Sequence, residues 1–325
     1  MELPVPEPGP GQVRIRIGGA GVCHSDLHLL ESGREGGASM FTLGHENAGW
    51  VDALGAGVTD FKEGDAVAVY GKWGCGQCAA CLRSCENYCT SVLPNRPALF
   101  GGAGVDGGMA EYMVVPSSRH LVLLKHLKPS MAAPLTDAAL TPYHAIKRAR
   151  HVLSPGVSVA VIGVGGLGHM AVQILKAITA CKIIALDVDD EKLNLALKAG
   201  AHTVLNCRGM ASVELIEGAS CGLVLDCVGS HESMKTALAL TGVDGHLMVL
   251  GLAGGVLPFS KSAVPWGATL SFPYWGSRAE LQEVICLAES GLIQPHVTFH
   301  PLSAGGAVIS DLQEGRVLGR AVLVP

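Results

Sequence analysis

The chain has 325 residues, of which 43 are glycine, 49% are hydrophobic and 16% are charged. This length accommodates two domains of ordinary size, and the composition is that of a globular protein. The formal net charge of -5 comes without any basic run, which excludes the electrostatic footprint of a nucleic-acid or anionic-membrane binder. Apolar stretches such as 157–162 are too short to span a bilayer, and no secretory signal is visible, so we expect a cytoplasmic protein.

The first 135 residues are rich in turns and in strand-like patterns. Polar and apolar residues alternate at 12–17, and 65–70 and 110–116 are also strand-like, with glycines between them. From about residue 138, helices alternate with short buried strands. These segments are helix 138–150, strand 157–162, helix 166–179, strand 182–187, helix 191–199, strand 222–226, helix 230–240 and strand 246–251. Strands separated by helices predict right-handed βαβ crossovers and a parallel sheet.

The chain therefore predicts an α/β protein of two domains. A compact β-rich domain is expected over 1–137, and a doubly wound parallel-sheet domain over 138–273. A further helix at 279–290 and a short β-like tail ending at 320–325 complete the first domain, which we expect to include 274–325.

A glycine-rich turn, GVGGLG over residues 163–168, joins a predicted strand to a predicted helix. Gly163 permits the tight turn, Gly165 lets the backbone approach a pyrophosphate, and Gly168 lets the helix pack closely on the strand. Asp187, at the end of the next strand, is placed to accept hydrogen bonds from ribose hydroxyls. This context favours a dinucleotide site over a glycine-rich turn of an unrelated α/β domain.

Asp187 also bears on which dinucleotide binds. A carboxylate at this position repels a 2′-phosphate, and Asp189 and Asp190 follow with no arginine beside them. The sequence predicts NAD in preference to NADP.

Eleven cysteines in a chain expected in a reducing compartment are more often metal ligands than disulfides. Four of them are closely spaced: Cys75, Cys78, Cys81 and Cys89. Four thiolates close a tetrahedral zinc site with no open position, which makes the site structural. Cys85 falls outside the spacing and is interpreted as a spare thiol. Spacing alone leaves an iron–sulfur cluster as the alternative.

A second metal site is suggested by Cys23 and His45, which we expect on turns of the β-rich domain. A thiolate and an imidazole with one further ligand leave zinc an open position for substrate, as catalytic sites do. Each residue alone is as consistent with an ordinary buried side chain. Their occurrence together with the cysteine loop and the dinucleotide turn favours the metal site.

With these motifs the chain resembles, over nearly its whole length, the zinc-dependent alcohol dehydrogenases of the medium-chain dehydrogenase/reductase superfamily. The segment PLTDAALTPY at 134–143 is similar to that of bacterial NAD-dependent members whose third catalytic zinc ligand is aspartate. The resemblance implies that Asp137 is this ligand; its alternative role is a helix N-cap. It also implies a GroES-like catalytic domain, a Rossmann NAD-binding domain, two zinc ions per chain and a homodimer or homotetramer.

The resemblance implies a mechanism as well. Zinc acts as a Lewis acid on the alcohol oxygen, and a hydride moves from the carbinol carbon to the nicotinamide. Ser25 takes the alcohol proton and passes it through the cofactor ribose to His28, which is alternatively an ordinary surface histidine. Glu46 is similar to the family glutamate beside the metal, and Asp26 to the carboxylate that orients the ligand His45.

Further contacts are implied in the same way. The additional cofactor-binding residues are His24, Thr141, Gly166, Leu167, Lys192 and Arg320. The aromatic residues in segments that line the family's substrate cleft, each alternatively a core residue, are Tyr70, Trp73, Tyr274 and Trp275. Gly71 stands where many members carry a bulky pocket residue. We therefore expect a small-molecule substrate, a medium-sized uncharged secondary alcohol or its ketone, rather than a primary alcohol or its aldehyde.

Two other function classes share single features with this sequence. A zinc-free, quinone-reductase-like relative is disfavoured by Cys23, His45 and the cysteine loop, and a zinc-ribbon module that binds nucleic acid is disfavoured by the acidic balance. Two departures from the family concern folding more than chemistry. Related chains begin earlier relative to the segment 8–11, and the stretch 206–220 is shorter than usual.

Overall fold

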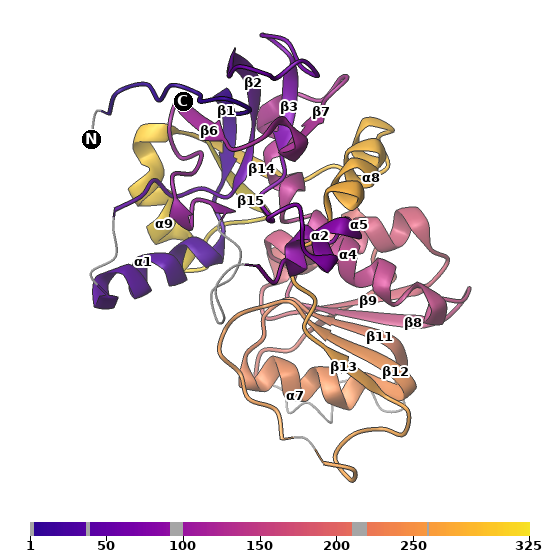
Figure 1. Cartoon of the computed structure of the whole chain (residues 1–325). Coiled ribbons are helices and arrows are strands. Elements are labelled where there is room, and N and C mark those ends of the chain that lie inside the picture. Colours follow the sequence, from indigo (N-terminus) through magenta and orange to yellow (C-terminus); the bar gives the residue numbers. More distant parts are fainter. Residues whose placement is uncertain (1–2, 37–39, 92–99, 210–219, 259) are drawn as a thin grey trace. The chain divides into compact units, whose positions relative to one another are not determined.

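The computed structural model describes residues 3–36, 40–91, 100–209, 220–258 and 260–325 (Figure 1). Most of the shortened stretch 206–220 thus lies outside the described residues. The chain packs into two compact units. Unit 1 comprises residues 1–140, 276–290 and 297–325, and unit 2 comprises 141–275 and 291–296. No helix within the described ranges is long and apolar enough to cross a membrane.

A seven-stranded sheet forms the centre of unit 1 (Figure 1). Its strands, in spatial order, are β14 (Val297–Pro301), β15 (Arg320–Val324), β1 (Val13–Gly21), β2 (Glu46–Leu54), β3 (Ala66–Val69) and β7 (Leu121–Leu123), with β6 (Tyr112–Val115) paired to β1. Val13, Ile15 and Ile17 point into the core from alternate positions of β1. The alternation that predicted a half-buried strand at 12–17 is therefore confirmed.

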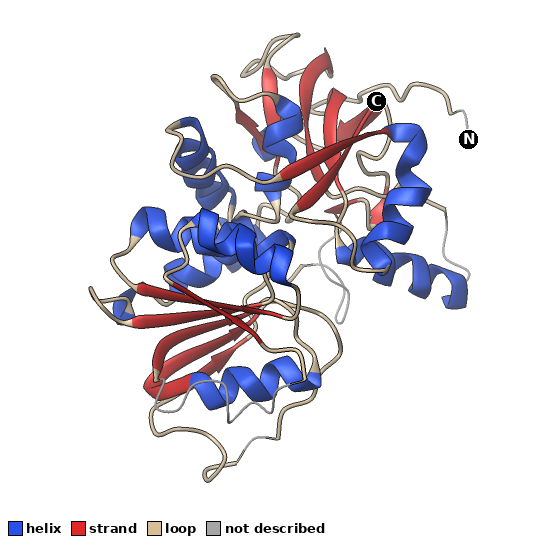
Figure 2. Cartoon of the chain, turned by 180° about the vertical axis from the view of Figure 1, so that it is seen from behind, coloured by secondary structure: helices blue, strands red, loops and turns tan. Residues whose placement is uncertain are grey.

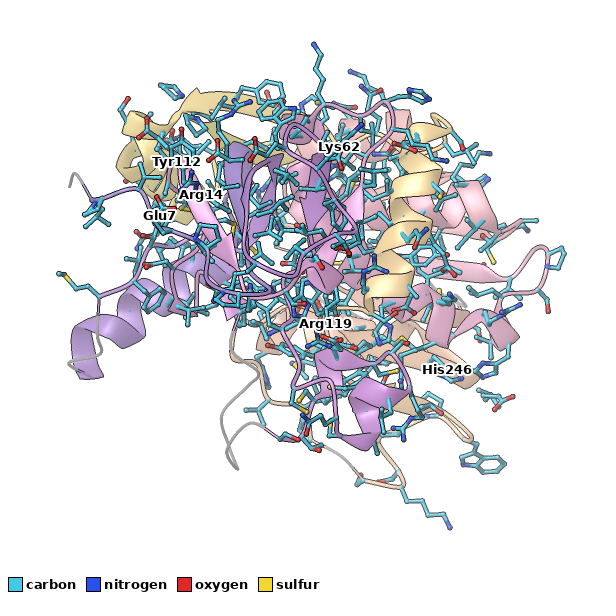
Figure 3. The ribbon with its side chains drawn as sticks, turned by 45° about the horizontal axis from the view of Figure 1, so that its top comes forward. Glu7, Arg14, Lys62, Tyr112, Arg119 and His246 are labelled. Atoms are coloured by element: carbon cyan, nitrogen blue, oxygen red, sulfur yellow. The ribbon has the colours of Figure 1, made fainter. Side chains whose placement is uncertain are left out.

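The opposite face of β1 carries charge. Arg14 donates to the Asp52 carboxylate at 2.7 Å, lies 3.1 Å from the Glu7 carboxylate, and packs over the Tyr112 ring (Figure 3). The Arg14–Asp52 pair is partly buried, with 15% and 25% of the two side chains exposed, whereas the Glu7 side chain is 83% exposed. This face thus carries the charged side chains and the opposite face the apolar ones, and this alternation sets the register of β1.

Unit 1 also contains five α-helices and a separate pair of short strands among its described residues. The helices are α1 (His24–Gly36), α2 (Ala79–Leu82), α3 (Pro129–Ala132), α8 (Arg278–Glu289) and α9 (Gly305–Gln313), and the strands are β4 (Phe100–Gly101) and β5 (Gly104–Val105). The expected turn after Cys23 is wrong, because helix α1 begins at His24. The Asp26 carboxylate accepts the backbone N–H of Cys23 at 2.9 Å, which satisfies a donor at the helix start. Helix α9 was not predicted, since two glycines open it.

Unit 2 is a six-stranded parallel sheet. Its spatial order is β10 (Thr203–Asn206), β9 (Lys182–Asp187), β8 (Ser158–Ile162), β11 (Cys221–Asp226), β12 (Thr241–Val249) and β13 (Thr269–Ser271). The helices of this part are α4 (Leu140–Arg148), α5 (Gly166–Ile178), α6 (Asp190–Ala199) and α7 (His231–Leu240). Helices α5 and α7 cover opposite faces of the sheet (Figures 1 and 2).

Strand β8 lies at the centre of the sheet, and the chain adds strands on both sides of it. From β8 the chain proceeds to β9 and β10 on one side, and later returns to place β11 on the other. The carboxyl ends of β8 and β11 therefore flank a topological switch point, where doubly wound sheets bind ligands. The predicted α/β class with a doubly wound parallel sheet is confirmed, and the glycine turn at 163–168 lies at this point.

Candidate functional site

The four closely spaced cysteines converge on one point. Their sulfur atoms are 3.5 Å apart for Cys78 and Cys81, 3.8 Å for Cys78 and Cys89, and 3.9 Å for Cys75 and Cys81. Zinc–sulfur bonds of about 2.3 Å place the corners of a tetrahedron about 3.8 Å apart. A disulfide needs sulfurs about 2.0 Å apart, so these thiols are free. The geometry fits one tetrahedral metal ion.

Backbone amides of the same loop favour thiolates. The N–H groups of Gln77 and Cys78 donate to the Cys75 sulfur at 3.4 and 3.3 Å, and the N–H of Cys75 donates to the Cys89 sulfur at 3.3 Å. Hydrogen bonds from the backbone of Cys81 and Thr90 lower the pKa of Cys78 to about 5. Burial, by contrast, raises the pKa of Cys81 to about 12, so the backbone favours the thiolate that a metal ion binds at some of the four positions and not at all of them.

A salt bridge outside the predicted site residues holds this loop. Arg119 donates to the Glu86 carboxylate at 2.6 Å and to the Gly74 carbonyl at 2.5 Å, and Glu86 in turn accepts the N–H of Gly74 at 3.1 Å. Nothing in the local spacing links position 86 to position 119, so this contact has no signal in the sequence.

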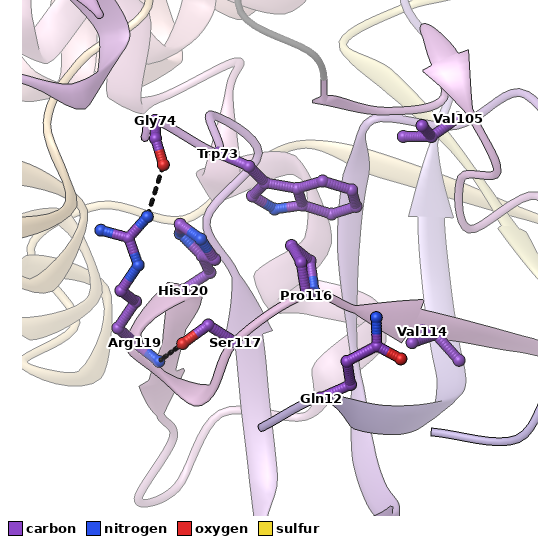
Figure 4. Close-up of a pocket in the computed structure, with 9 residues that line it drawn as sticks. All are labelled: Gln12, Trp73, Gly74, Val105, Val114, Pro116, Ser117, Arg119 and His120. Atoms are coloured by element: carbon purple, nitrogen blue, oxygen red, sulfur yellow. Dashed lines mark hydrogen bonds between the residues drawn. The ribbon is translucent and has the colours of Figure 1, made fainter. Parts of the chain in front are cut away.

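A cavity of about 460 Å³ lies beside the loop (Figure 4). Its lining residues are Gln12, Trp73, Gly74, Val105, Val114, Pro116, Ser117, Arg119 and His120. None of the predicted zinc ligands lines it. Burial, with the neighbouring charges of Arg119 and Arg278, lowers the pKa of His120 to about 3, so this imidazole is neutral.

Two aromatic residues predicted for the substrate cleft lie near this cavity. Trp73 lines it and donates its indole N–H to the Tyr70 carbonyl at 3.0 Å. Tyr70 is fully buried, and its hydroxyl donates to the Gly276 carbonyl at 2.7 Å. Their role in substrate contact stays a prediction.

The second candidate metal site gathers Cys23, His45, Glu46 and Asp137, all buried. The Asp137 Oδ2 lies 3.6 Å from the His45 Nε2 and 3.9 Å from the Cys23 sulfur. Zinc bonds of about 2.0–2.3 Å to oxygen, nitrogen and sulfur separate tetrahedral ligand atoms by about 3.3–3.8 Å. This arrangement also fits one metal ion.

Separate elements supply these side chains. Cys23 follows β1, and His45 precedes β2 after Gly44, whose φ of 100° is a left-handed value that favours glycine. Asp137 follows a buried 3₁₀ turn, and α4 begins only at Leu140. Asp137 therefore lies too far before Leu140 to be the N-cap of α4. Its carboxylate faces Cys23 and His45 instead.

Asp26 connects the two ends of the cluster. Its Oδ1 lies 3.2 Å from the His45 Nδ1, and its Oδ2 accepts the N–H of Cys23 at 2.9 Å. Burial by itself lowers the pKa of His45, but the carboxylates of Asp26 and Asp137 raise it well above its usual value. The cluster therefore stabilises positive charge, as a cation site must.

A buried ion pair lies next to the cluster. Arg320 donates through Nε to the Glu46 Oε2 at 2.9 Å and through its second nitrogen to Oε1. Burial raises the pKa of Glu46, and Arg320 acts in the opposite direction. The guanidinium that the resemblance assigns to a pyrophosphate is thus engaged within unit 1. That assignment stays a prediction.

Lys72 is a further charged group at this site. It is fully buried, and its Nζ lies 3.7 Å from the centre of the Phe100 ring, whose edge meets the His45 ring. Burial lowers its pKa to about 7, while the Asp137 charge raises it. The burial of Lys72 has no signal in the sequence, because the spacing of residues does not reveal which side chains the fold removes from solvent.

The predicted proton path begins beside the cluster. The Ser25 hydroxyl lies 3.8 Å from the Cys23 sulfur, and Ser25 and His28 are three residues apart on α1, a spacing that brings side chains to one helix face. His28 is exposed and lies 3.9 Å from Glu31, and His24 is exposed as well.

The glycine turn in unit 2 has the geometry that a dinucleotide needs. Gly163 has a φ of 82°, and a Cβ at Gly168 would lie 1.9 Å from the Gly163 carbonyl oxygen. A Cβ at Gly165 would meet nothing within 4 Å, so this position is open for a ligand. The three glycines thus have different reasons for lacking a side chain, a pattern typical of a pyrophosphate-binding turn, and their contact with a cofactor stays a prediction.

Asp187 lies beside this turn. Its Oδ2 accepts the N–H of Val164 at 2.6 Å, and its Oδ1 accepts the N–H groups of Val188 and Asp189 at 2.8 and 3.1 Å. An arginine does approach: Arg208 donates to the Val188 carbonyl at 3.0 Å. No arginine stands beside Asp189 and Asp190 in the sequence, but the fold brings Arg208 from the end of β10 to the residue that follows Asp187.

The remaining predicted residues are placed as follows. Thr141 is buried in α4, and Leu167 and Lys192 are half-buried in the first turns of α5 and α6. The Tyr274 and Trp275 rings meet edge to face at 6.5 Å. Trp275 has a φ of 54°, a strained value for a bulky residue that is found most often at functional sites.

Two family models match the chain. The alcohol dehydrogenase GroES-like domain matches residues 9–126, and the zinc-binding dehydrogenase domain matches residues 166–290.

Known proteins match along almost the full length. A D-arabinose 1-dehydrogenase (NADP(+)) of Saccharolobus solfataricus is 34% identical, covering 99% of this chain and 92% of the relative. An NAD-dependent alcohol dehydrogenase of Sulfurisphaera tokodaii is 34% identical, covering 100% and 95%. The acetophenone reductase of Geotrichum candidum, solved in complex with NAD, superposes with a TM-score of 0.86 at 31% identity, covering 100% and 93%.

The cysteine loop generates a first prediction. Cys78→Ser should lower the zinc content from two to about one per chain and reduce the melting temperature, because three thiolates no longer close the tetrahedron. Cys85→Ser is the matched control, a cysteine of the same loop outside the four, and should change neither quantity. Elemental analysis and thermal unfolding measure both. Equal zinc loss in the two variants would contradict the assignment.

The buried pair generates a second prediction. A Cβ at Gly21 would lie 2.0 Å from the Glu46 Oε2. Gly21→Ala should therefore displace Glu46 from Arg320 and lower the free energy of unfolding by about 1–3 kcal/mol. Gly306→Ala, where a Cβ meets nothing within 4 Å, should be neutral or stabilising. Urea unfolding compares them, and a Gly21→Ala protein as stable as the control would show that Glu46 tolerates displacement.

Proposed function

We propose a specific reaction for this chain on the premise that it belongs to the zinc-dependent alcohol dehydrogenases of the medium-chain dehydrogenase/reductase superfamily. Members transfer a hydride reversibly between an alcohol and NAD with the help of zinc. The proposed substrate is a medium-sized uncharged secondary alcohol, and the product is the matching ketone. The proposed site residues are Cys23, His45 and Asp137 for the catalytic zinc, and Cys75, Cys78, Cys81 and Cys89 for the structural zinc.

The observation that carries this proposal is the convergence of Cys23, His45 and Asp137. Three ligands leave zinc a fourth position for substrate, whereas the cysteine loop fills all four. Asp26, 3.2 Å from the His45 Nδ1, holds the imidazole so that Nε2 faces Asp137. Glu46 lies within the same group, but its two oxygens already accept from Arg320.

When bound, zinc supplies a Lewis acid for the alcohol oxygen and NAD supplies the hydride acceptor. The chain's own residues orient these groups and move the proton. The Ser25 hydroxyl, 3.8 Å from the Cys23 sulfur, is placed to accept the alcohol proton. The exposed His28, on the same face of α1, exchanges a proton with solvent. Fully buried Glu46 and Asp26 keep the ligands in place.

The proposed cofactor residues lie at the switch point of unit 2. Gly163, Gly165 and Gly168 let the backbone approach the pyrophosphate, and Asp187 accepts from the adenosine ribose. The proposal keeps NAD as the preferred cofactor because the Asp187 charge repels a 2′-phosphate. Arg208, which follows β10 and donates to the Val188 carbonyl, is the group that would favour NADP if that charge were removed.

Secondary alcohols are proposed because of Gly71 and because of a relative. A glycine leaves room for the second substituent of the carbinol carbon. The acetophenone reductase of similar structure acts, by its name, on a ketone whose reduction gives a secondary alcohol. The relative named for D-arabinose shows that members of similar identity take sugars instead, so the substrate depends on pocket residues and not on the fold.

The proposal includes an intracellular, oligomeric enzyme. All eleven cysteines are free, which is typical of a reducing compartment such as the cytoplasm. A homodimer or homotetramer is expected from the family resemblance, and light scattering measures it directly.

The catalytic zinc is tested by Asp137→Ala. This variant should lose one of the two zinc ions and reduce kcat/KM by more than about a hundredfold, because two remaining ligands hold zinc poorly. The structural zinc and the melting temperature should persist. Asp52→Ala, which removes a partly buried partner of Arg14 outside the cluster, is the control. Full turnover with both zinc ions retained would refute the ligand assignment.

Cofactor choice is tested at Asp187. Asp187→Ala should weaken NAD binding about tenfold or more and reduce the discrimination against NADP, since it removes both the ribose acceptor and the repulsive charge. Asp187→Asn keeps the shape without the charge and separates the two effects. Adding Arg208→Ala should remove whatever NADP binding Asp187→Ala gains. Equal wild-type efficiency with NAD and NADP would overturn the assignment.

Substrate class is tested by pairs of isomers. We expect a higher kcat/KM for 2-butanol than for 1-butanol, because both substituents of a secondary carbinol carbon need room. Gly71→Ala should reduce the value for 2-butanol more than that for 1-butanol. A preference of the wild type for primary alcohols, ethanol above all, would contradict the proposal. An unchanged ratio in Gly71→Ala would locate the selectivity elsewhere.

A further inference from the structure

His169 is a fully buried histidine in the first turn of α5, directly after the glycine turn. The imidazole makes two hydrogen bonds with backbone groups far apart in sequence. Its Nδ1 lies 2.9 Å from the Gly165 carbonyl oxygen, and its Nε2 accepts the N–H of His296 at 3.2 Å. All three residues belong to unit 2.

These two contacts fix the tautomer. A backbone N–H only donates, so the Nε2 facing His296 carries a lone pair and no proton. In the neutral ring the proton is then on Nδ1, which donates to the Gly165 carbonyl. The ring therefore acts as a donor toward the glycine turn and as an acceptor toward the segment 291–296.

The Gly165 carbonyl receives a second donor from the same residue. The backbone N–H of His169 donates to it at 3.1 Å, so both of its lone pairs are engaged by His169. The carbonyl of Gly165 and the N–H of Gly166 belong to one planar trans peptide and point in opposite directions. Holding the carbonyl toward the helix thus directs the Gly166 N–H out of the helix N-terminus, where a phosphate binds.

The acceptor side of the ring has support one turn further along α5. Gln173 donates to the Gln294 carbonyl at 2.9 Å and accepts the Gln294 N–H at 2.8 Å. Positions 169 and 173 are four apart and share a helix face. This face binds the segment 291–296, which explains why that segment packs with unit 2 and not with the residues that flank it in sequence.

We propose that His169 is a positioning residue for the dinucleotide, with one ring nitrogen orienting the Gly165–Gly166 peptide toward the phosphates and the other anchoring the segment 291–296. The inference rests on the dinucleotide site proposed above. Through this ring, occupation of the phosphate site and order of the segment 291–296 are linked, and linkage of this kind acts equally in both directions.

Two conservative variants separate the two nitrogens. The amide nitrogen of Asn occupies the place of Nδ1, so His169→Asn keeps the donor to Gly165 and loses the acceptor for His296. The amide oxygen of Gln reaches the place of Nε2, so His169→Gln keeps the acceptor for His296 and loses the donor. Gln173→Ala is the matched control on the same helix face, because it weakens only the anchoring of the segment.

The measurements are the Kd of NADH by fluorescence titration and amide hydrogen exchange across 291–296, on the zinc-loaded full chain. One hydrogen bond to the peptide corresponds to about a three- to tenfold change in Kd. His169→Gln should raise the Kd of NADH and the KM of NAD by that factor with little change in kcat. His169→Asn and Gln173→Ala should stay within about twofold of the wild-type Kd, but should exchange faster in the segment.

NADH binding should slow exchange in this segment in the wild type and less so in His169→Asn. An unchanged Kd in His169→Gln overturns the proposal, and so does an increase in His169→Asn as large as in His169→Gln. If His169→Gln does not fold, the Kd of NADH for His169→Asn still tests the proposal. A value within about twofold of wild type supports it, and a larger increase contradicts it. A wild-type protein that binds no NADH would refute the proposed function itself, which is a different outcome.

Discussion

The buried ion pair between Glu46 and Arg320 is the interaction on which the proposed catalytic cluster depends. Glu46 opens β2 and Arg320 opens β15, and Gly21, the last residue of β1, is paired with Glu46 on one side and with Val322 on the other. Cys23 follows this junction by two residues, and His45 precedes it by one. The Glu46 and Arg320 side chains are both buried. Losing either one would leave the other as an unpaired buried charge, which costs about 3–5 kcal/mol.

From this dependence we expect small changes near the junction to affect the candidate metal site. The pair itself contributes little net stability, because desolvation of two charges offsets most of their attraction. What it provides is position. Because Arg320 fixes Glu46, the adjacent His45 is placed with its Nδ1 toward the Asp26 carboxylate and its Nε2 toward the Asp137 carboxylate. Gly21 is required at the junction because a side chain there would occupy the place of the Glu46 carboxylate.

The parts that sequence reasoning predicted are those with local signatures. The cysteine loop spans fifteen residues at 75–89, and the glycine turn lies between one strand and one helix, so spacing alone carried their chemistry. The contacts that it missed join distant positions: Arg119 with Glu86, Arg208 with Val188, and His169 with His296. Helix α1 was missed for a similar reason, since its start is stabilised by Asp26, a residue interpreted only through its role at the metal.

Charge explains why only one of the two metal clusters suits catalysis. Four thiolates around Zn²⁺ leave a net charge of about −2, which opposes the further negative charge of an alcohol losing its proton. A cysteine thiolate, an aspartate and a neutral histidine leave a net charge near zero, and the adjacent Glu46–Arg320 pair adds none. A zinc ion bound in the proposed catalytic cluster would thus remain a strong Lewis acid. A zinc ion in the cysteine loop would have no free coordination position, and its negative ligands would repel an alkoxide. The two sites differ in ligand charge before any difference in shape is considered.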